Sequence, residues 1–277
     1  MSDKRTKRKL KMGWKIFFII VAVIAGIHAV HALTLDQTVE YAETSYYSES
    51  LPDHLDGYTF AFITDTHNAS PEDLEAVAKR LNAYSLDALF LGGDHALGDG
   101  TWQTMQALSN VNTVDGIYGV EGNHDDYKAL FSVMQSYGIT PLDNTGVALH
   151  DGLYLAGVQD LWNRAPNVDQ SVSGAQDGDF VILLCHNPDY SMQADTSRAN
   201  IILSGHTHGG HITLFGMLAP ALLMRVSITD YGQMFMGGWC TGASGTDVYV
   251  SRGIGSFRNV PRVFARPQVI IMTLHSA

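Results

Sequence analysis

Short apolar segments that are each followed at once by aspartate, asparagine or histidine recur five times along this chain. Their lengths and their β-branched and aromatic residues are typical of buried strands, and helical patterns lie between most of them. Strands that alternate with helices predict an α/β domain. The five expected strands span residues 58–63, 87–91, 116–120, 181–185 and 199–203.

The segments between these strands carry helix and hairpin signals. Ser70 is placed to cap a helix that has Pro71 at its first position, and apolar residues recur at helical spacing after it. The other expected elements are helices at 102–108 and 127–134, a hairpin of 146–150 with 153–158, and closing strands at 248–251 and 268–274.

The polar residues that follow the five strands are expected to share one site, because α/β sheets bind ligands at the carboxyl ends of their strands. Taken singly, each cluster has an ordinary explanation as a helix cap, a turn or a buried core histidine. Capping does not readily explain why all five occur at strand ends. Since residues two apart in an extended backbone point the same way, His206 and His208 would aim at one spot.

The chemistry of these residues favours metal binding. The candidate ligands are Asp65, His67, Asp94, Asn123, His186, His206 and His208. Seven nitrogen and oxygen ligands are too many for one ion and suit two divalent ions that share a carboxylate, with Mn, Fe or Zn preferred to Ca or Mg. Two such ions would lower the pKa of a shared water and produce a hydroxide nucleophile able to attack phosphorus.

These motifs resemble, in order, those of the calcineurin-like metallophosphoesterase superfamily. The matching segments are Asp65-x-His67, Gly93-Asp94, Gly122-Asn123-His124-Asp125, His186 and Gly205-His206-Thr207-His208. Residues 186–189 and 250–255 further resemble the membrane-anchored bacterial YkuE/YaeI-type branch. The resemblance covers about residues 55–275 and implies a four-layer α-β-β-α sandwich of two mixed sheets.

The resemblance also implies roles for single residues. Asp65, His67, Asp94 and His208 would bind the first metal, and Asp94, Asn123, His186 and His206 the second, with Asp94 bridging. His124 would stabilise the transition state or protonate the leaving oxygen, and Asp125 would orient His124. The family pattern Gly-Asp-x-x-Asp/Glu has Leu97 here in place of its acidic residue. That acidic residue is not normally a metal ligand, so its absence affects the expected contacts around the ligands and not the ligands themselves. His95 and His211 are expected to line the pocket.

The first residues predict a membrane anchor. Residues 1–13 are basic, and residues 14–33 are apolar and long enough to cross a bilayer as a helix. The basic flank predicts a cytoplasmic N-terminus and an extracytoplasmic catalytic domain. A cleaved signal peptide is the alternative, with Val30-His31-Ala32 as its cleavage site. Residues 34–56 are expected to form a linker, and residues 57–277 the metallophosphoesterase domain.

Net charge and composition limit the classes of partner that the chain is expected to bind. The chain has a net charge of -11, and its basic residues are concentrated at the N-terminus, so bulk nucleic-acid binding is not expected. Residues 215–224 are nearly all apolar and form either core packing or a lip for a lipid-linked phosphate. Arg164, Arg252 and Arg258 are candidates for gripping substrate, although surface salt bridges explain them equally well. The two cysteines, Cys185 and Cys240, would allow one disulfide.

The resulting hypothesis is a dinuclear-metal phosphoester hydrolase. Relatives in the branch that the chain resembles include phosphodiesterases and UDP-diacylglucosamine pyrophosphate hydrolases. The expected substrate is therefore an envelope or lipid-linked phosphodiester or pyrophosphate. The alternatives are a non-catalytic anchored protein that keeps the fold to bind a ligand, and a nuclease with the same metal centre.

Overall fold

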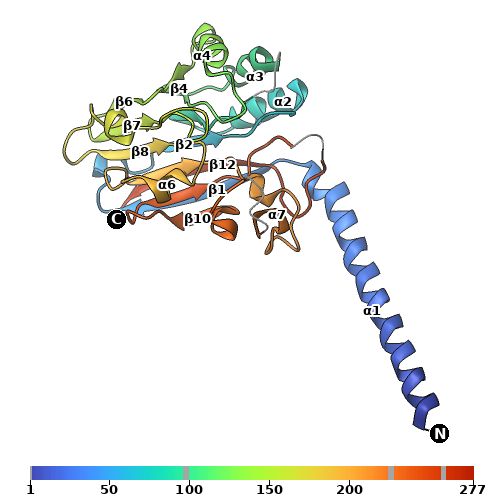
Figure 1. The fold of residues 1–277 in the computed structure, drawn as a ribbon. Helices are drawn as coiled ribbons and strands as arrows, with labels where there is room; N and C mark the ends of the chain where they lie inside the picture. Colours follow the sequence, from blue (N-terminus) through green and yellow to red (C-terminus); the bar gives the residue numbers. More distant parts are fainter. Residues whose placement is uncertain (1, 96–99, 224–227, 257–259) are drawn as a thin grey trace.

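The chain forms two six-stranded sheets that pack face to face, and a long helix, α1, projects from this body (Figure 1). The computed structural model describes residues 2–95, 100–223, 228–256 and 260–277, with side chains from residue 12 onward. Both sheets are mixed. The fold is the four-layer α/β sandwich that the sequence predicts.

The first sheet has the strand order β1-β12-β2-β3-β4-β5. Its members are β1 (Glu40–Ser48), β12 (Gln268–Ser276), β2 (Thr59–Ile63), β3 (Ala88–Leu91), β4 (Gly116–Gly119) and β5 (Thr140–Pro141). All neighbours are parallel except β12 and β2, which are antiparallel. The three expected strands at residues 58–63, 87–91 and 116–120 are therefore adjacent and parallel.

The second sheet has the order β10-β11-β9-β8-β7-β6. Its members are β10 (Gly238–Thr241), β11 (Asp247–Val250), β9 (Ile201–Ser204), β8 (Phe180–Leu184), β7 (Leu153–Gly157) and β6 (Thr145–His150). The two edge strands, β10 and β6, pair antiparallel with their neighbours, and the inner strands are parallel. The β6–β7 pair is the expected hairpin.

Alternation along each strand divides the core into layers. Phe60 and Phe62 of β2 enter the core between the sheets, together with Ile182 of β8. Their neighbour Ile63 faces the opposite way, into the layer beneath the helices on the first sheet. Those helices are α2 (Pro71–Leu81), α3 (Thr101–Leu108) and α4 (Tyr127–Ser136), and the outer face of the second sheet carries the short helices α5 (Val168–Ser171) and α6 (Tyr190–Gln193).

The local signals for these helices are confirmed. The Ser70 side chain accepts a hydrogen bond from the backbone N–H of Asp73, and Pro71 is the first residue of α2. The four-residue helix α7 (Pro220–Leu223) and the short 3₁₀ segments η1 (Leu35–Gln37), η2 (Asp53–Leu55), η4 (His208–Gly210) and η5 (Gly232–Phe235) complete the elements. Cys185 and Cys240 are both free thiols, so the disulfide left open by the sequence is not formed.

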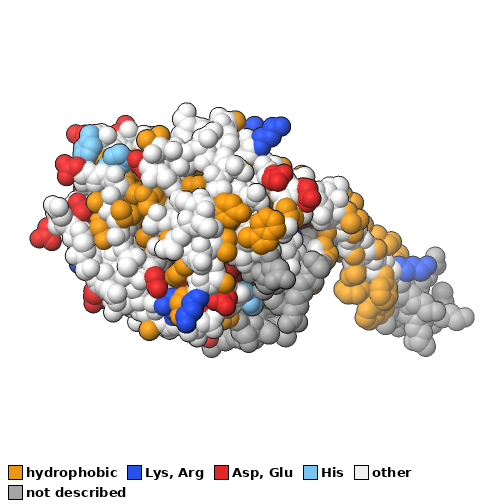
Figure 2. Space-filling view, turned by 90° about the horizontal axis from the view of Figure 1, so that it is seen from above, with side chains coloured by type: hydrophobic (Ala, Val, Ile, Leu, Met, Phe, Trp, Pro, Cys, Tyr) orange, Lys and Arg blue, Asp and Glu red, His pale blue; other side chains and the backbone are white. Residues whose placement is uncertain are grey.

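Helix α1 (Ser2–Leu33) contains the apolar segment at 14–33. Residues Met12–Gln37 form the one span, among the described residues, that is long and apolar enough to cross a membrane. Figure 2 shows this helix extending from the body with apolar side chains along its surface. Its apolar side chains are exposed to a degree that globular helices do not tolerate in water. The direction in which it crosses a membrane stays a prediction.

The expected linker at residues 34–56 is wrong for residues 40–48. These residues form β1, which pairs with β12 in parallel from Glu40 to Ser48. Glu43 and Ser45, two of the polar residues that suggested a tether, are exposed on this edge strand, whereas Ala42 and Tyr46 pack against the inter-sheet core. The folded body therefore begins before residue 57.

Candidate metal centre

The expected site residues follow the carboxyl ends of strands from both sheets. Strands β2, β3 and β4 of the first sheet lead into Asp65, Asp94 and Asn123. Strands β8 and β9 of the second sheet lead into His186 and into the 206–208 segment. Six of the seven candidate ligands form two clusters, in each of which the potential ligand atoms lie within 4.8 Å of one another.

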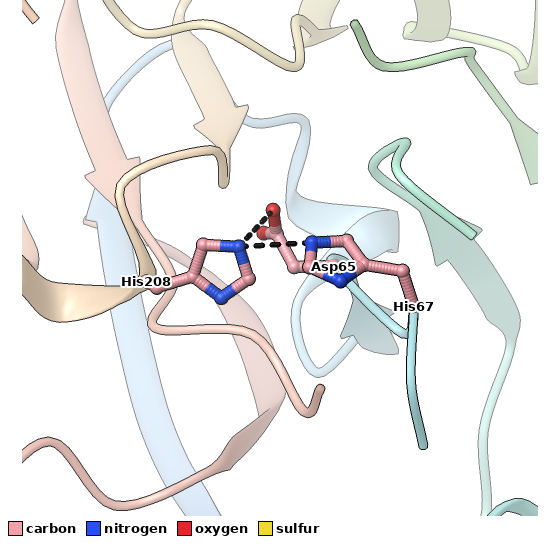
Figure 3. Close-up of side chains that lie close together, drawn as sticks. All are labelled: Asp65, His67 and His208. Atoms are coloured by element: carbon pink, nitrogen blue, oxygen red, sulfur yellow. Dashed lines mark hydrogen bonds and ion pairs between the residues drawn. The ribbon is translucent and has the colours of Figure 1, made fainter. Parts of the chain in front are cut away.

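The first cluster consists of Asp65, His67 and His208 (Figure 3). The Nε2 atoms of His67 and His208 are 3.0 Å apart, and His208 Nε2 lies 3.5 Å from Asp65 Oδ1. All three residues are buried. Two imidazole nitrogens and a carboxylate oxygen that face one point supply the donor set of a divalent transition metal.

The second cluster consists of Asp94, His186 and His206. His186 donates from Nδ1 to the carbonyl of Gly92 at 2.8 Å, which leaves its Nε2 facing Asp94 Oδ2 at 3.3 Å. His206 Nε2 lies 2.8 Å from the Ile228 carbonyl, so its Nδ1 is free to act as a ligand.

A buried atom beside this second cluster tests whether the residues fit a metal. Within the described part of the chain, Asn123 Oδ1 has no hydrogen-bond partner, and His186 Nε2 has its 3.3 Å contact with Asp94 Oδ2. Buried polar atoms rarely remain unpaired in proteins, and both atoms are good ligands. Asp94 also lies between the clusters, since its Oδ2 is 4.0 Å from His67 Nε2. The donor set therefore fits two ions, and the bridging role of Asp94 stays a prediction.

The electrostatics of the second cluster favour a cation. Burial, together with the neighbouring His186, lowers the pKa of His206 to about 3, which keeps that ring neutral and its lone pair free. Burial is the largest single influence on His186 and disfavours its charged form, but the carboxylates of Asp94, Asp65 and Asp160 together raise the pKa of His186 to about 10. A protonated His186 thus places a positive charge where a bound metal ion would place one.

The backbone at the site adopts unusual conformations. Asp65 and Asp94 both have φ of 52°, and His206 and His208 have φ of 71° and 51°. Non-glycine residues in this left-handed region are uncommon and gather at functional sites. The extended backbone assumed for His206 and His208 is therefore wrong, and their rings enter different clusters rather than one spot.

Glycines allow the loops to approach this closely. A side chain at Gly122 would run into the Asp94 carboxylate, and one at Gly205 would run into Asp65 and Thr64. The flanking glycines of the motifs therefore serve close packing as well as turning.

Asp125 holds two of the ligand-bearing loops together. Its buried carboxylate accepts hydrogen bonds from the backbone N–H groups of Asp94 and Gly122, each at 2.8 Å, and of His95 at 3.0 Å. The expected orientation of His124 by Asp125 stays a prediction. The His124 N–H donates to Asp94 Oδ1 at 2.8 Å, which places this histidine beside the ligands.

A cavity of about 510 Å³ opens over the clusters. Its lining includes Asp94, Asn123, His124, His206 and His208 together with Trp162, His211, Ile212, Ala221, Ile228 and Val260. The Trp162 ring meets the His206 ring edge to face, with centroids 4.5 Å apart. His211 lines this cavity as expected, whereas the fully buried His95 borders a separate cavity of about 150 Å³ and accepts a hydrogen bond from the Gly93 N–H.

Residues 58–210 match the calcineurin-like phosphoesterase family. The chain belongs to this family. The matched segment contains both ligand clusters, so the family resemblance of the motifs is confirmed and the chain is a metal-dependent phosphoester hydrolase.

Curated relatives carry the same family name. The chain is 31% identical over 256 residues to the uncharacterized metallophosphoesterase YkuE of Bacillus subtilis, covering 86% of both chains. It is 28% identical to an uncharacterized metallophosphoesterase of Helicobacter pylori, covering 82% of this chain and 61% of that protein. It is 27% identical to a Danio rerio transmembrane protein with a metallophosphoesterase domain, covering 94% of this chain and 63% of that protein. This chain thus spans about three fifths of the latter two proteins.

Two of the arginines expected to grip substrate, Arg164 and Arg252, are not among the described residues that line the cavity. The Arg252 guanidinium pairs with Glu40 of β1 and donates to the Arg266 carbonyl, and it does not border the described walls of the cavity. Arg164 pairs with Glu121 and Asp143. Both charges are thus engaged in structural pairs, as the salt-bridge alternative predicted. Arg258 lies outside the described residues.

Trp162 and Arg262 are absent from the residues expected at the site. Trp162 follows β7, and the rule of polar residues after a parallel strand, applied to Gln159 and Asp160, would have drawn attention to that loop. The buried Arg262 donates to the backbone carbonyl of His208 at 3.2 Å, and its Nη2 lies 3.2 Å from Nδ1 of that histidine. A single arginine between a loop and a strand carries no sequence signal that would reveal this contact.

Proposed function

We propose that this phosphoesterase hydrolyses a phosphodiester or pyrophosphate whose remaining part is a large apolar group, as in a lipid-linked phosphate of the cell envelope. The composition of the cavity wall carries this proposal. Beside the ligand residues, the described lining of the cavity contains Trp162, Ile212, Ala221, Ile228 and Val260, and no lysine or arginine. These apolar side chains favour contact with an apolar part of the substrate over contact with the many phosphates of a nucleic-acid backbone.

The cluster residues would hold two metal ions, one at each cluster. Asp65, His67 and His208 would hold one divalent ion, and Asp94, Asn123, His186 and His206 the other, Mn, Fe or Zn being suited to the donor set. When bound, such ions supply Lewis-acid chemistry that activates water and neutralises phosphoryl charge.

His124 lines the cavity beside Asp94 and would donate a proton from its ring to the oxygen that leaves phosphorus. This proton would spare the substrate an unstable alkoxide leaving group. Trp162, which also lines the cavity, would position the apolar part of the substrate by ring contact.

Variants of two aspartates test the proposal. In the full chain in detergent, Asp94→Asn is expected to lose bound metal and to lower hydrolysis of an aryl phosphodiester by at least about 10³-fold, because the carboxylate of the second cluster is replaced by a neutral amide. The control Asp169→Asn changes an exposed carboxylate on α5 and is expected to leave both unchanged. Full activity of Asp94→Asn, or of chelated wild-type protein, would contradict the proposal, and absence of metal and turnover in wild-type protein would favour the non-catalytic alternative.

The substrate class needs a separate comparison. With Mn, Fe or Zn added, a phosphodiester that carries an acyl chain is expected to have a lower KM than the same head group without it. Trp162→Ala is expected to raise KM only for the acyl substrate, by about 10-fold, since it removes apolar contact rather than metal ligands. Equal KM values for the two substrates would contradict the proposed apolar group of the substrate and leave only the proposed hydrolysis of a phosphoester.

A further inference from the structure

An exposed apolar surface lies next to the metal-site cavity. It consists of Ile212, Leu214, Phe215, Met217, Leu218 and Leu223, which are 36 to 73% exposed, and is called the apolar rim below. Residues 214–218 of the apolar rim form a tight turn. In it, the Leu214 N–H donates to the Leu218 carbonyl at 2.7 Å and the Met217 N–H to the Leu214 carbonyl at 3.1 Å. Met217 in this turn is 73% exposed. Apolar residues that cluster in this way on a water-exposed protein surface usually mark a contact surface.

The apolar rim is held against the end of α1. The Phe215 ring lies 4.6 Å from the His28 ring of α1 and 5.5 Å from Phe264. His31, one turn further along α1, stacks on Phe264 at 3.8 Å. The backbone N–H of Phe264 in turn donates to Asp36, which also bonds His31. Figure 1 shows α7, which ends at rim residue Leu223, near the end of α1 and on the side of the body toward which the helix runs.

These contacts place the apolar rim at a defined depth relative to a bilayer. A helix of about 20 residues crosses a hydrocarbon core of about 30 Å. Counted from Trp14, such a span ends at Leu33, and His28 lies about one and a half turns before that end. Phe215, in contact with His28, therefore lies at the level of the bilayer surface and not in bulk water. No aspartate, glutamate, lysine or arginine occurs between residues 199 and 224, so the sequence of this loop carries no charge to oppose insertion.

We propose that the apolar rim inserts into the surface of the membrane that α1 spans, on the side of the catalytic body, as a second membrane contact. Because Ile212 belongs to the rim and also lines the cavity, the cavity then opens beside the lipid leaflet. An acylated substrate can enter it without leaving the bilayer. The inference depends on α1 as a membrane span, and it does not depend on the hydrolytic chemistry.

Depth-dependent fluorescence quenching tests the insertion with the full chain in phosphatidylcholine vesicles. Single cysteines that carry a nitrobenzoxadiazole label are placed at Met217, at Ile20 in α1 and at Val114, with Cys185 and Cys240 replaced by alanine. Val114 is the matched control, because it is a 79% exposed apolar residue on the turn before β4. Lipid with a nitroxide near its head group is expected to quench the labels at positions 20 and 217 severalfold more than the label at position 114.

Each other result overturns the insertion. Quenching at position 217 that matches position 114, with strong quenching at position 20, means that the apolar rim stays outside the lipid. A label at 217 that is shielded from water but not quenched by lipid means that a second copy or another protein covers the rim. Weak quenching at position 20 removes the membrane span itself. Insertion is expected to be the same in Asp94→Asn, so failure of the proposed hydrolysis and failure of membrane insertion remain distinguishable.

Discussion

At the scale of single residues, Arg262 is an unusual feature of the site. It is only 3% exposed, and burial lowers its pKa to about 10, so it remains charged at neutral pH. Its guanidinium donates to the carbonyls of Gly255, His208 and Ala265, and its Nη2 lies 3.2 Å from Nδ1 of His208. The bonds to these carbonyls use four of the five N–H donors of the side chain. One residue thus joins the loop that carries His208 to the segment before β12.

Replacement of Arg262 is expected to destabilise the fold. Arg262→Met leaves buried acceptors without donors and is expected to lower the free energy of unfolding by about 2–4 kcal/mol. Arg262→Lys keeps the charge but offers three donors in place of five, so a smaller loss is expected. Urea unfolding of the full chain in detergent measures both, with the exposed Arg198→Met as control. A loss for Arg262→Met no larger than that of the control would contradict this account.

The residues that form the two clusters could be predicted from the sequence, but their conformations could not. Asp65, Asp94 and both histidines of the 206–208 motif are predictable as site residues because they follow apolar strands, a pattern that can be read from the sequence alone. Their left-handed backbones depend on loops from both sheets that hold them there, such as the Asp125 bonds to Asp94 and Gly122. Contacts between distant segments leave no periodic trace in the sequence.

At the scale of elements, β1 shows why a strand was mistaken for a linker. An edge strand exposes one side to water, so its polar residues obscure its pattern, and its partner β12 lies at the other end of the chain. Tyr46 of β1 joins the two sheets, because its hydroxyl donates to Asp247 of β11 at 3.0 Å and to the Asn200 carbonyl at 3.3 Å. The inner strands were predicted because they are apolar on both faces.

Tyr46→Phe tests whether β1 is part of the folded body. Loss of the hydroxyl is expected to lower the free energy of unfolding by about 1–1.5 kcal/mol, the value of a partly buried hydrogen bond. The neighbour Tyr47 is 65% exposed and stacks on His275, so Tyr47→Phe is expected to change stability by less than about 0.5 kcal/mol. Thermal unfolding of the two variants measures the difference. Equal effects would mean that β1 contributes nothing through Tyr46 to the joining of the sheets.

At the scale of the whole molecule, each ligand cluster draws on both sheets. Asp65 and His67 follow β2 of the first sheet, whereas their partner His208 follows β9 of the second. Asp94 follows β3 of the first sheet, and its partners His186 and His206 follow β8 and β9 of the second. Bound cations would therefore tie the two halves of the sandwich together at one edge. Unfolding, which separates the sheets, would have to release them.

Metal removal is accordingly expected to lower the Tm of the whole chain. A ligand that binds only the folded state, present at about 100 times its Kd, stabilises by about 2.7 kcal/mol per site, and a domain of this size gains roughly 2–4 °C per kcal/mol. With both sites filled, chelation of the full chain in detergent should thus lower Tm by roughly 10–20 °C, and Mn, Fe or Zn should restore it. Asp94→Asn should lose most of this metal-dependent shift, because Asp94 lies between the clusters, while Asp169→Asn should keep it. A shift of equal size in both variants would mean that the stabilising ions bind outside the two clusters.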